Sequence, residues 1–204
     1  MKIDKYKSLW ISGTILIVAV GLFTDFQILA SVNYKVPADH ISQLNLIQVQ
    51  RKNIMQLTSS DFQNNGPIPQ KFSCEGQGIN PELNISGVPA AAKSLAFILH
   101  DPDAPIAGGF THWVLFDIAP TTTKIAENSV PAGAKQGKNG TGKNVYIGMC
   151  PPSGTHHYHF MLYALDKSLD LKAASTTKDS LLQAIQGHVV AETELIGTYQ
   201  KTGK

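Results

Sequence analysis

The sequence has little charge and no segment dominated by charge of one sign. Aspartate, glutamate, lysine and arginine together make up 16% of the 204 residues, and the formal net charge is +2. The lysines are scattered along the chain rather than gathered into one stripe. Proteins that bind nucleic acid through its phosphates carry a basic stripe or patch, so this composition argues against a nucleic-acid partner.

Cysteine is also scarce, and Cys74 and Cys150 are the two that the chain contains. An even number of cysteines permits one disulfide in an oxidising compartment, and two separate buried thiols are the alternative. A bridge needs Cα atoms within about 7 Å of each other, a distance that the sequence does not give. No internal repeat is visible, so repeat architectures are not indicated.

The first 30 residues form a separate segment. Lys2, Lys5 and Lys7 precede an uninterrupted run of apolar or small residues from Leu9 to Phe23. This run is shorter than the roughly 20 residues of a membrane span, and a basic start before such a run is typical of a signal peptide. Residues 28–31 make a poor cleavage site, so an uncleaved N-terminal membrane anchor is the alternative. In both cases we expect an exported protein, periplasmic or extracellular, that meets a membrane only through this segment if it is uncleaved.

Short apolar segments separated by glycine and proline make up the rest of the chain. Residues 31–52 are interpreted as a spacer, and residues 53–204 as one domain. Strands are expected at residues 54–58, 70–74, 83–86, 95–99, 110–118, 145–148, 156–166 and 189–199. One helix is expected at residues 178–186, and residues 121–144 are interpreted as one long loop. This pattern predicts an all-β protein, a sandwich or barrel with small helical insertions.

Polar side chains collect at the turn between the strands expected at 95–99 and 110–118. Asp101 and Asp103 lie in the turn, and His112 follows near the start of the second strand. Burying polar groups without partners costs roughly 2 to 7 kcal/mol each, so packing alone seldom explains such a cluster. We therefore expect a polar ligand to bind there.

Alternation along the strands brings a second segment to the same place. Side chains at positions i and i+2 share a face of a strand, so His156 and Tyr158 face the same way. On the preceding strand one face is expected to carry His112, Val114, Phe116 and Ile118. If these strands are neighbours or near neighbours, His112 and His156 lie at the rim of one cavity, and Asp101 accepts a hydrogen bond from one imidazole. Such a rim suits an anion such as phosphate.

Three motifs in this order resemble those of the phosphatidylethanolamine-binding protein (PEBP) family, more narrowly its bacterial branch of Raf-kinase-inhibitor-like proteins. The motifs are Asp101-Pro102-Asp103-Ala104-Pro105, Thr111-His112-Trp113, and Cys150-Pro151-Pro152-Ser153-Gly154 followed by His156 and Tyr158. The resemblance covers about residues 54–200. Met149 departs from the proline that bacterial relatives often carry before this cysteine.

The resemblance implies an antiparallel fold of two packed sheets with one or two short helices. It also implies a non-enzymatic pocket for phosphate, phosphorylated head groups or similar small anions, without a cofactor or metal. By resemblance, Asp101, His112, His156 and Tyr158 lie in this pocket. Pro152 and the backbone around Cys150 form one wall, and Asp103 mainly secures the turn. A homodimer is expected by resemblance only.

Three other functions stay open at this point. A hydrolase could use Asp101 and His112 as acid and base or Ser153 as nucleophile, although Pro-Ser-Gly is not the Gly-x-Ser-x-Gly turn of serine hydrolases. A zinc site at His156-His157-x-His159 is disfavoured, because alternation sends His156 away from the other two. A protein-interaction role, such as inhibition of a kinase or protease, would use the loop at residues 121–144.

Overall fold

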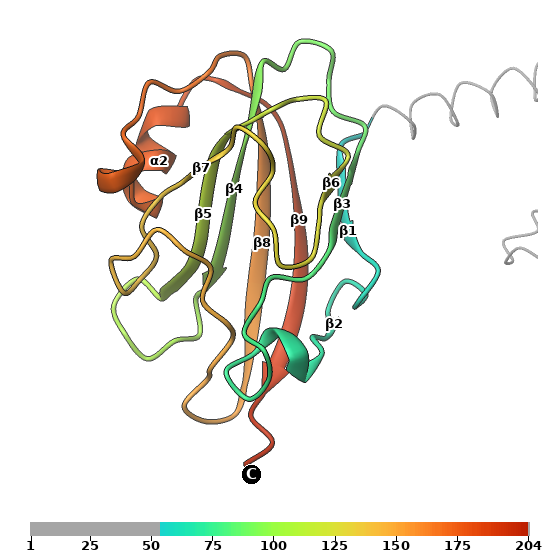
Figure 1. Ribbon diagram of the computed structural model, residues 1–204, viewed down its shortest axis with the longest axis vertical. Coiled ribbons are helices and arrows are strands. Elements are labelled where there is room, and N and C mark those ends of the chain that lie inside the picture. Colours follow the sequence, from blue (N-terminus) through green and yellow to red (C-terminus); the bar gives the residue numbers. More distant parts are fainter. Residues whose placement is uncertain (1–53, 204) are drawn as a thin grey trace, which may run out of the picture. The chain divides into compact units, whose positions relative to one another are not determined.

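A computed structural model describes residues 54–203, so the expected signal or anchor segment and the expected spacer lie outside the described residues. Two β-sheets form the framework of the described part (Figure 1). In sheet order, the six-stranded sheet contains β2 (Gly66–Pro67), β9 (Val189–Gln200), β8 (Thr155–Leu165), β4 (Ser94–Asp101), β5 (Phe110–Ile118) and β7 (Lys135–Gln136). The three-stranded sheet contains β1 (Gln56–Ser59), β3 (Leu83–Ser86) and β6 (Lys124–Ile125). Every ladder is antiparallel except the short β2–β9 pairing, so the prediction of a mainly β fold with two sheets is confirmed.

The helices are short. They are α2 (Lys178–Ile185) and two 3-10 turns, η2 (Gln70–Phe72) and η3 (Ala173–Ser175). Thr177 caps α2, because its side chain accepts the N–H of Ser180 while the Ser180 hydroxyl accepts the N–H of Thr177. The expected helix is thus confirmed to within one residue. None of the helices in residues 54–203 is long and apolar enough to cross a membrane.

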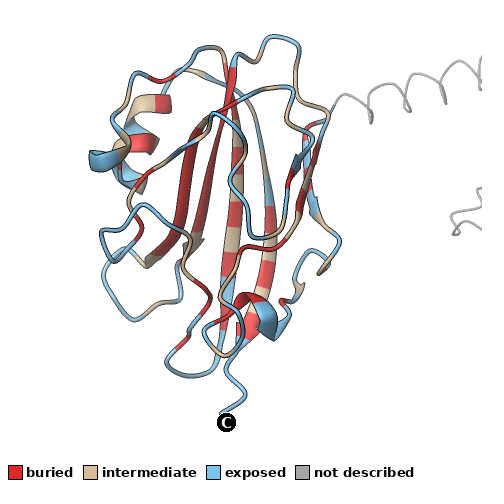
Figure 2. Cartoon of the chain, viewed as in Figure 1, coloured by how far each residue is buried: buried red, intermediate tan, exposed pale blue. Residues whose placement is uncertain are grey.

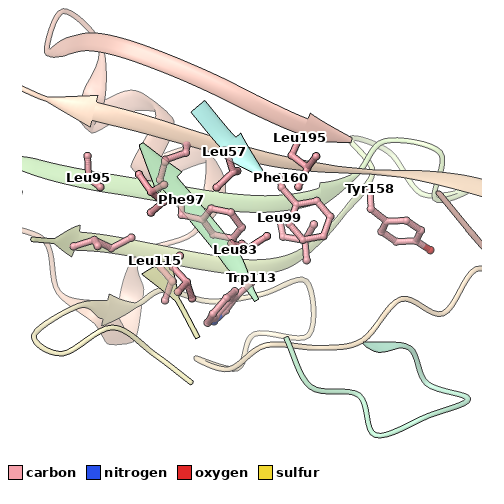
Figure 3. Packing of buried hydrophobic residues seen from close by; sticks show 14 of the residues in the cluster. Leu57, Leu83, Leu95, Phe97, Leu99, Trp113, Leu115, Tyr158, Phe160 and Leu195 are labelled. Carbon is pink, nitrogen blue, oxygen red and sulfur yellow. The ribbon is translucent and has the colours of Figure 1, made fainter. Parts of the chain in front are cut away.

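The main core lies between the two sheets. Phe97, Leu99 and Phe160 of the large sheet pack in one cluster with Leu57 and Leu83 of the small sheet (Figure 3). Along β8, buried positions alternate with half-buried or exposed ones, as expected for a strand with one face in the core (Figure 2). A second cluster covers the other face of the large sheet beneath α2. Its members include Ala96, Ile98, Val114, Phe116, Leu181 and Ile185.

Three segments differ from the strand pattern expected from the sequence. Residues 70–74 form no strand: Gln70–Phe72 is a 3-10 turn, in which the N–H groups of Phe72 and Ser73 donate to carbonyls three residues earlier. Residues 145–148 form no strand, since the single sheet-like bond there runs from Ile147 N to His112 O at 3.1 Å. The segment 121–144 is not one uninterrupted loop, because it contains β6 and β7.

A β-bulge in β5 sets the direction of His112. Leu99 pairs with Trp113, but the next residue, His100, pairs with Thr111. His112 is therefore an extra residue in the ladder, and such bulges re-aim the side chain that they carry. The ring of His112 consequently lies on the inner face of the sheet, the same face as its neighbour Trp113.

The expectation that His112, Val114, Phe116 and Ile118 share one face is wrong for this reason. Val114 and Phe116 lie in the cluster beneath α2, whereas Ile118 belongs to the core between the sheets. A second irregularity, near Asp117 with its φ of 54°, returns Ile118 to the inner face. Simple alternation holds along β8 but fails along β5.

Candidate functional site

A cavity of about 220 Å³ lies where β4 ends and β5 begins. Three segments line it: the end of β4 with the loop that follows, the start of β5, and the segment that precedes β8. The lining residues are Asp101, Ala104, Pro105, Ile106, Phe110, His112, Ile147, Gly148, Cys150 and Pro152. Of the residues predicted for the pocket, Asp101, His112, Cys150 and Pro152 therefore lie in its wall.

Asp101 is a buried acceptor in this wall. Its Oδ2 lies 2.8 Å from Nδ1 of His156, and its Oδ1 accepts the N–H of Asp103 at 2.9 Å. The side chains of Asp101 and His156 are 4% and 8% exposed. Because β4 lies between β8 and β5, Asp101 can orient His156 on one side while lying beside His112 on the other. The expectation that Asp101 orients one imidazole is confirmed, and that imidazole belongs to His156.

His112 has its tautomer set by the backbone. Its Nδ1 lies 2.8 Å from the carbonyl oxygen of Ile147. A carbonyl only accepts, so Nδ1 carries the proton, and Nε2 of the neutral ring has a free lone pair. Burial lowers the pKa of His112 from its ordinary 6.5 to about 4, against the opposing effects of the Ile147 carbonyl and the Asp101 charge. The imidazole is therefore uncharged at neutral pH.

Tyr158 lies directly behind the cavity lining. Its ring packs edge-to-face against His112, with centroids 5.3 Å apart, and stacks on His156 at 6.5 Å. Its hydroxyl is the one fully buried side-chain polar atom in residues 54–203 without a hydrogen-bond partner. Figure 3 shows this hydroxyl pointing away from the leucine and phenylalanine side chains of the core. Burial raises the pKa of Tyr158 above its usual range, and the nearby Asp101 carboxylate adds to this through its charge and as a hydrogen-bond acceptor, so the hydroxyl keeps its proton.

A disulfide fixes one wall of the cavity. Cys150 is bonded to Cys74, with the two Cα atoms 5.4 Å apart. The N–H of Cys74 also donates to the carbonyl of Met149 at 3.0 Å. Gly148 permits this close approach, because a Cβ there would lie 2.9 Å from the carbonyl oxygen of Phe72. The sequence permitted either a disulfide or two separate buried thiols, and the structure contains the disulfide.

Asp103 and the remaining candidate residues lie outside the cavity lining. Asp103 Oδ2 accepts the N–H of His157 at 2.8 Å and lies 2.7 Å from its Nδ1, which holds the β4–β5 loop against β8. His159 pairs with Glu194 at 2.7 Å, on the opposite face of β8 from His156. No group of three His, Cys, Asp or Glu in the described part of the chain is placed to hold a metal ion. Ser153 is exposed in the turn before β8.

The comparisons with known proteins agree with this arrangement of strands. Residues 58–200 match the family model for phosphatidylethanolamine-binding protein. The chain belongs to the phosphatidylethanolamine-binding protein family. It is 46% identical over 152 residues to a UPF0098 protein of Methanothermobacter thermautotrophicus, covering 72% of this chain and 99% of the relative. It is 44% identical over 151 residues to a UPF0098 protein of Chlamydia trachomatis, with the same coverage of each chain.

Solved structures of PEBP-family proteins have the same fold. A crystal structure of a putative PEBP homologue from Chlamydia trachomatis matches with a TM-score of 0.70 at 44% identity, covering 73% of this chain and 99% of that one. Escherichia coli YBCL, described as a new member of the mammalian PEBP family, matches with a TM-score of 0.69 at 29% identity. That match covers 72% of this chain and 99% of YBCL.

Sequence reasoning missed the apolar rim of this PEBP-family cavity. Ile106, with 56% of its surface exposed, lies at the rim beside Pro105. The ring of Phe110 packs edge-on against His112, with centroids 4.9 Å apart. Phe110 could have been found, because it lies two residues before His112 near the start of the same strand. The carbonyl of Ile147 could not, because side-chain patterns do not report backbone atoms.

Proposed function

We propose that this PEBP-family chain is a non-enzymatic binding protein for a small anion or a phosphorylated head group. The binding site is the cavity formed around Asp101, His112, His156 and Tyr158. The observation that carries the proposal is the hydroxyl of Tyr158, which is buried beside His112 without a partner in residues 54–203. Native proteins seldom leave such a donor unused. The hydroxyl lies behind the cavity lining, so an anion oxygen would accept from it once the lining side chains in front of it shift.

The size of the cavity and its backbone also support a small anion. Its volume of about 220 Å³ lies below the roughly 300–1,000 Å³ of pockets that hold drug-sized ligands, so a head group fits better than a whole lipid. The N–H of Gly148, in the cavity lining, makes no backbone hydrogen bond within residues 54–203. It is therefore free to donate to a ligand oxygen that reaches it. The Cys74–Cys150 bridge supports export of the protein, because disulfides persist in oxidising compartments.

A hydrolase of small phosphoesters is the second candidate. The observation that favours it is the Asp101–His156 pair, because a carboxylate on Nδ1 orients an imidazole as a general base. Ser153, the nucleophile considered from the sequence, makes no hydrogen bond to His156 among the described residues and is exposed to solvent. Binding without turnover is therefore the favoured function.

Titration of the full chain with inorganic phosphate and with phosphoethanolamine tests this proposal. We expect saturable shifts of the His112 and His156 ring resonances at millimolar ligand. His188, which pairs with Asp166 at 3.0 Å away from the cavity, is the internal reference. Tyr158→Phe should weaken binding, whereas Tyr163→Phe, on the other face of β8, should not. Unchanged spectra for His112 and His156 would contradict the binding site, and phosphoester turnover lost in His156→Ala would establish the hydrolase.

A further inference from the structure

We infer that this cavity binds its anion together with a proton. It therefore selects a phosphate monoester, or another oxyacid that retains an acidic hydroxyl, over a sulfate ester or a phosphodiester. The acceptor for that acidic hydroxyl is Nε2 of His112. This inference rests on the proposed function, because it concerns the same site.

The tautomer of His112 is the first step. Its one N–H is donated to the carbonyl of Ile147 at 2.8 Å, so the uncharged ring has no N–H left for a ligand. Nε2 has no hydrogen-bond partner among residues 54–203, and the residue lines the cavity. The ring is held between those of Phe110 and Tyr158, at 4.9 and 5.3 Å. His112 therefore offers a ligand a lone pair, which repels an anion oxygen but accepts from a hydroxyl.

The charge of the lining is the second step. Asp101 is the one charged side chain in the cavity lining, which contains no lysine or arginine among the described residues. Both of its carboxylate oxygens already accept hydrogen bonds, from His156 and from the N–H of Asp103. A dianion would face this buried carboxylate without a fixed cation to offset the repulsion. A ligand that arrives with one proton carries less charge into the site.

The number of donors and acceptors is the third step. The Tyr158 hydroxyl and the Gly148 N–H are two donors that no described residue uses, and Nε2 of His112 is one acceptor. A protonated phosphate monoester has two acceptor oxygens and one hydroxyl. Its P–OH would donate to Nε2, and its other two oxygens would accept from the Gly148 N–H and, once the lining in front of it shifts, from the Tyr158 hydroxyl. A sulfate ester has no hydroxyl to donate and leaves Nε2 facing a third acceptor.

Several other groups that titrate face His112 or lie close to it. They are His100 and Asp101 on β4, His156 and Tyr158 on β8, and Tyr146 in the segment before β8. Burial raises the pKa of both tyrosines, so they keep their protons. Burial and the charge of Lys178 lower the pKa of His100, which lies on the opposite face of β4. A test must therefore separate His112 from its neighbours Asp101 and His156.

Phenyl phosphate and phenyl sulfate are the probes, because they have similar shapes but only the phosphate can hold a proton near neutral pH. Each is titrated into the full chain by calorimetry at about pH 6 and about pH 8, in two buffers of different ionisation enthalpy. We expect phenyl phosphate to take up about one proton per site at the higher pH, and its Kd to rise about tenfold per pH unit above its second pKa. The Kd of phenyl sulfate should be about tenfold higher than that of phenyl phosphate near neutral pH and should not vary with pH.

The 15N resonances of the histidine rings in the unmodified protein identify the group that accepts the proton of the bound ligand. With phenyl phosphate bound, the 15N resonance of His112 Nε2 should move toward that of a protonated or hydrogen-bonded nitrogen. His112→Asn keeps an N–H for the Ile147 carbonyl and should lose the preference for phosphate over sulfate, whereas His188→Asn should keep it. Equal affinity for both probes without proton uptake overturns the inference, as does uptake that leaves Nε2 of His112 unchanged. Failure of both probes to bind overturns the proposed function itself.

Discussion

Nδ1 of His156 lies 2.8 Å from Oδ2 of Asp101, and this buried pair joins the start of β8 to the end of β4 across 55 residues of sequence. Removing one partner of a buried pair leaves the other charge without compensation. We predict that His156→Ala lowers the free energy of unfolding by about 3 kcal/mol, measured by urea denaturation.

The neighbouring pair of His157 and Asp103 is the matched control, because it has the same chemistry in solvent. Its side chains are 53% and 42% exposed. His157→Ala should therefore lower the free energy of unfolding by no more than about 1 kcal/mol. Similar losses in His156→Ala and His157→Ala would mean that burial adds nothing to the Asp101–His156 pair.

Tyr158→Phe should separate stability from binding. The hydroxyl is buried without a partner in residues 54–203, and leaving a buried donor unsatisfied costs about 1–3 kcal/mol. The phenylalanine variant without ligand should thus be as stable as the unmodified protein or more stable by about 1 kcal/mol. Its affinity for phosphate should nevertheless fall. A marked loss of stability in thermal unfolding would show that the hydroxyl has a partner within the protein.

His112 should make stability depend on pH in a defined direction. Burial lowers its pKa in the folded chain to about 4, below the ordinary 6.5 expected when unfolded. The folded state therefore favours the neutral ring, and the unfolded state binds more protons between these values. This contribution is present above the unfolded pKa and is lost as the pH falls from about 6.5 to about 4, by about 3 kcal/mol in total.

Urea denaturation across this pH range, for the unmodified protein and for His112→Asn, measures the effect. The difference between the two free energies of unfolding should shrink as the pH falls, because the variant has no imidazole to protonate. Subtracting the variant also removes the titration of carboxylates common to both chains. Two curves that stay parallel from about pH 7 to about pH 4 would rule out a buried neutral His112.

Much of this site followed from residue patterns. Alternation along β8 correctly predicted that His156 and Tyr158 share the buried face, because that strand pairs regularly along the stretch that carries them. It failed along β5, where the bulge at His112 depends on how the strand pairs with β4. His112 reaches the predicted site through that bulge and not through the alternation from which it was inferred.

The remaining features of the site depend on contacts that no local pattern encodes. The carbonyl that fixes the tautomer of His112 belongs to Ile147, 35 residues away. It lies in the segment 145–148, for which the prediction of a strand is wrong. The 3-10 turn η2 stands where a strand was expected, and the segment that contains it places Phe72 in the core and Cys74 against Cys150. The resemblance to the PEBP family pointed to Asp101, His112, Cys150 and Pro152, which line the cavity, but not to the hydrogen bonds around them.

The Cys74–Cys150 bridge should contribute both to stability and to the cavity wall. It closes a loop of 76 residues, for which loop-closure entropy gives a stabilisation of about 4 kcal/mol. The double variant Cys74→Ser, Cys150→Ser should lose about this amount in urea denaturation, and its phosphate affinity should fall because Cys150 lines the cavity. Reducing agent should destabilise the unmodified protein but leave the double variant unchanged. Equal stability of the two chains without reductant would contradict the prediction.

The apolar rim should favour ligands that carry an apolar group next to the anion. Ile106 is 56% exposed at the cavity, where an aromatic substituent could cover it. We expect phenyl phosphate to bind about tenfold more tightly than inorganic phosphate, a difference of about 1.4 kcal/mol. Ile106→Ser should reduce this preference without changing the affinity for inorganic phosphate, whereas Val190→Ser, at an exposed position on β9, should change neither. Equal binding of the two ligands to the unmodified chain would show that the rim does not contribute to recognition.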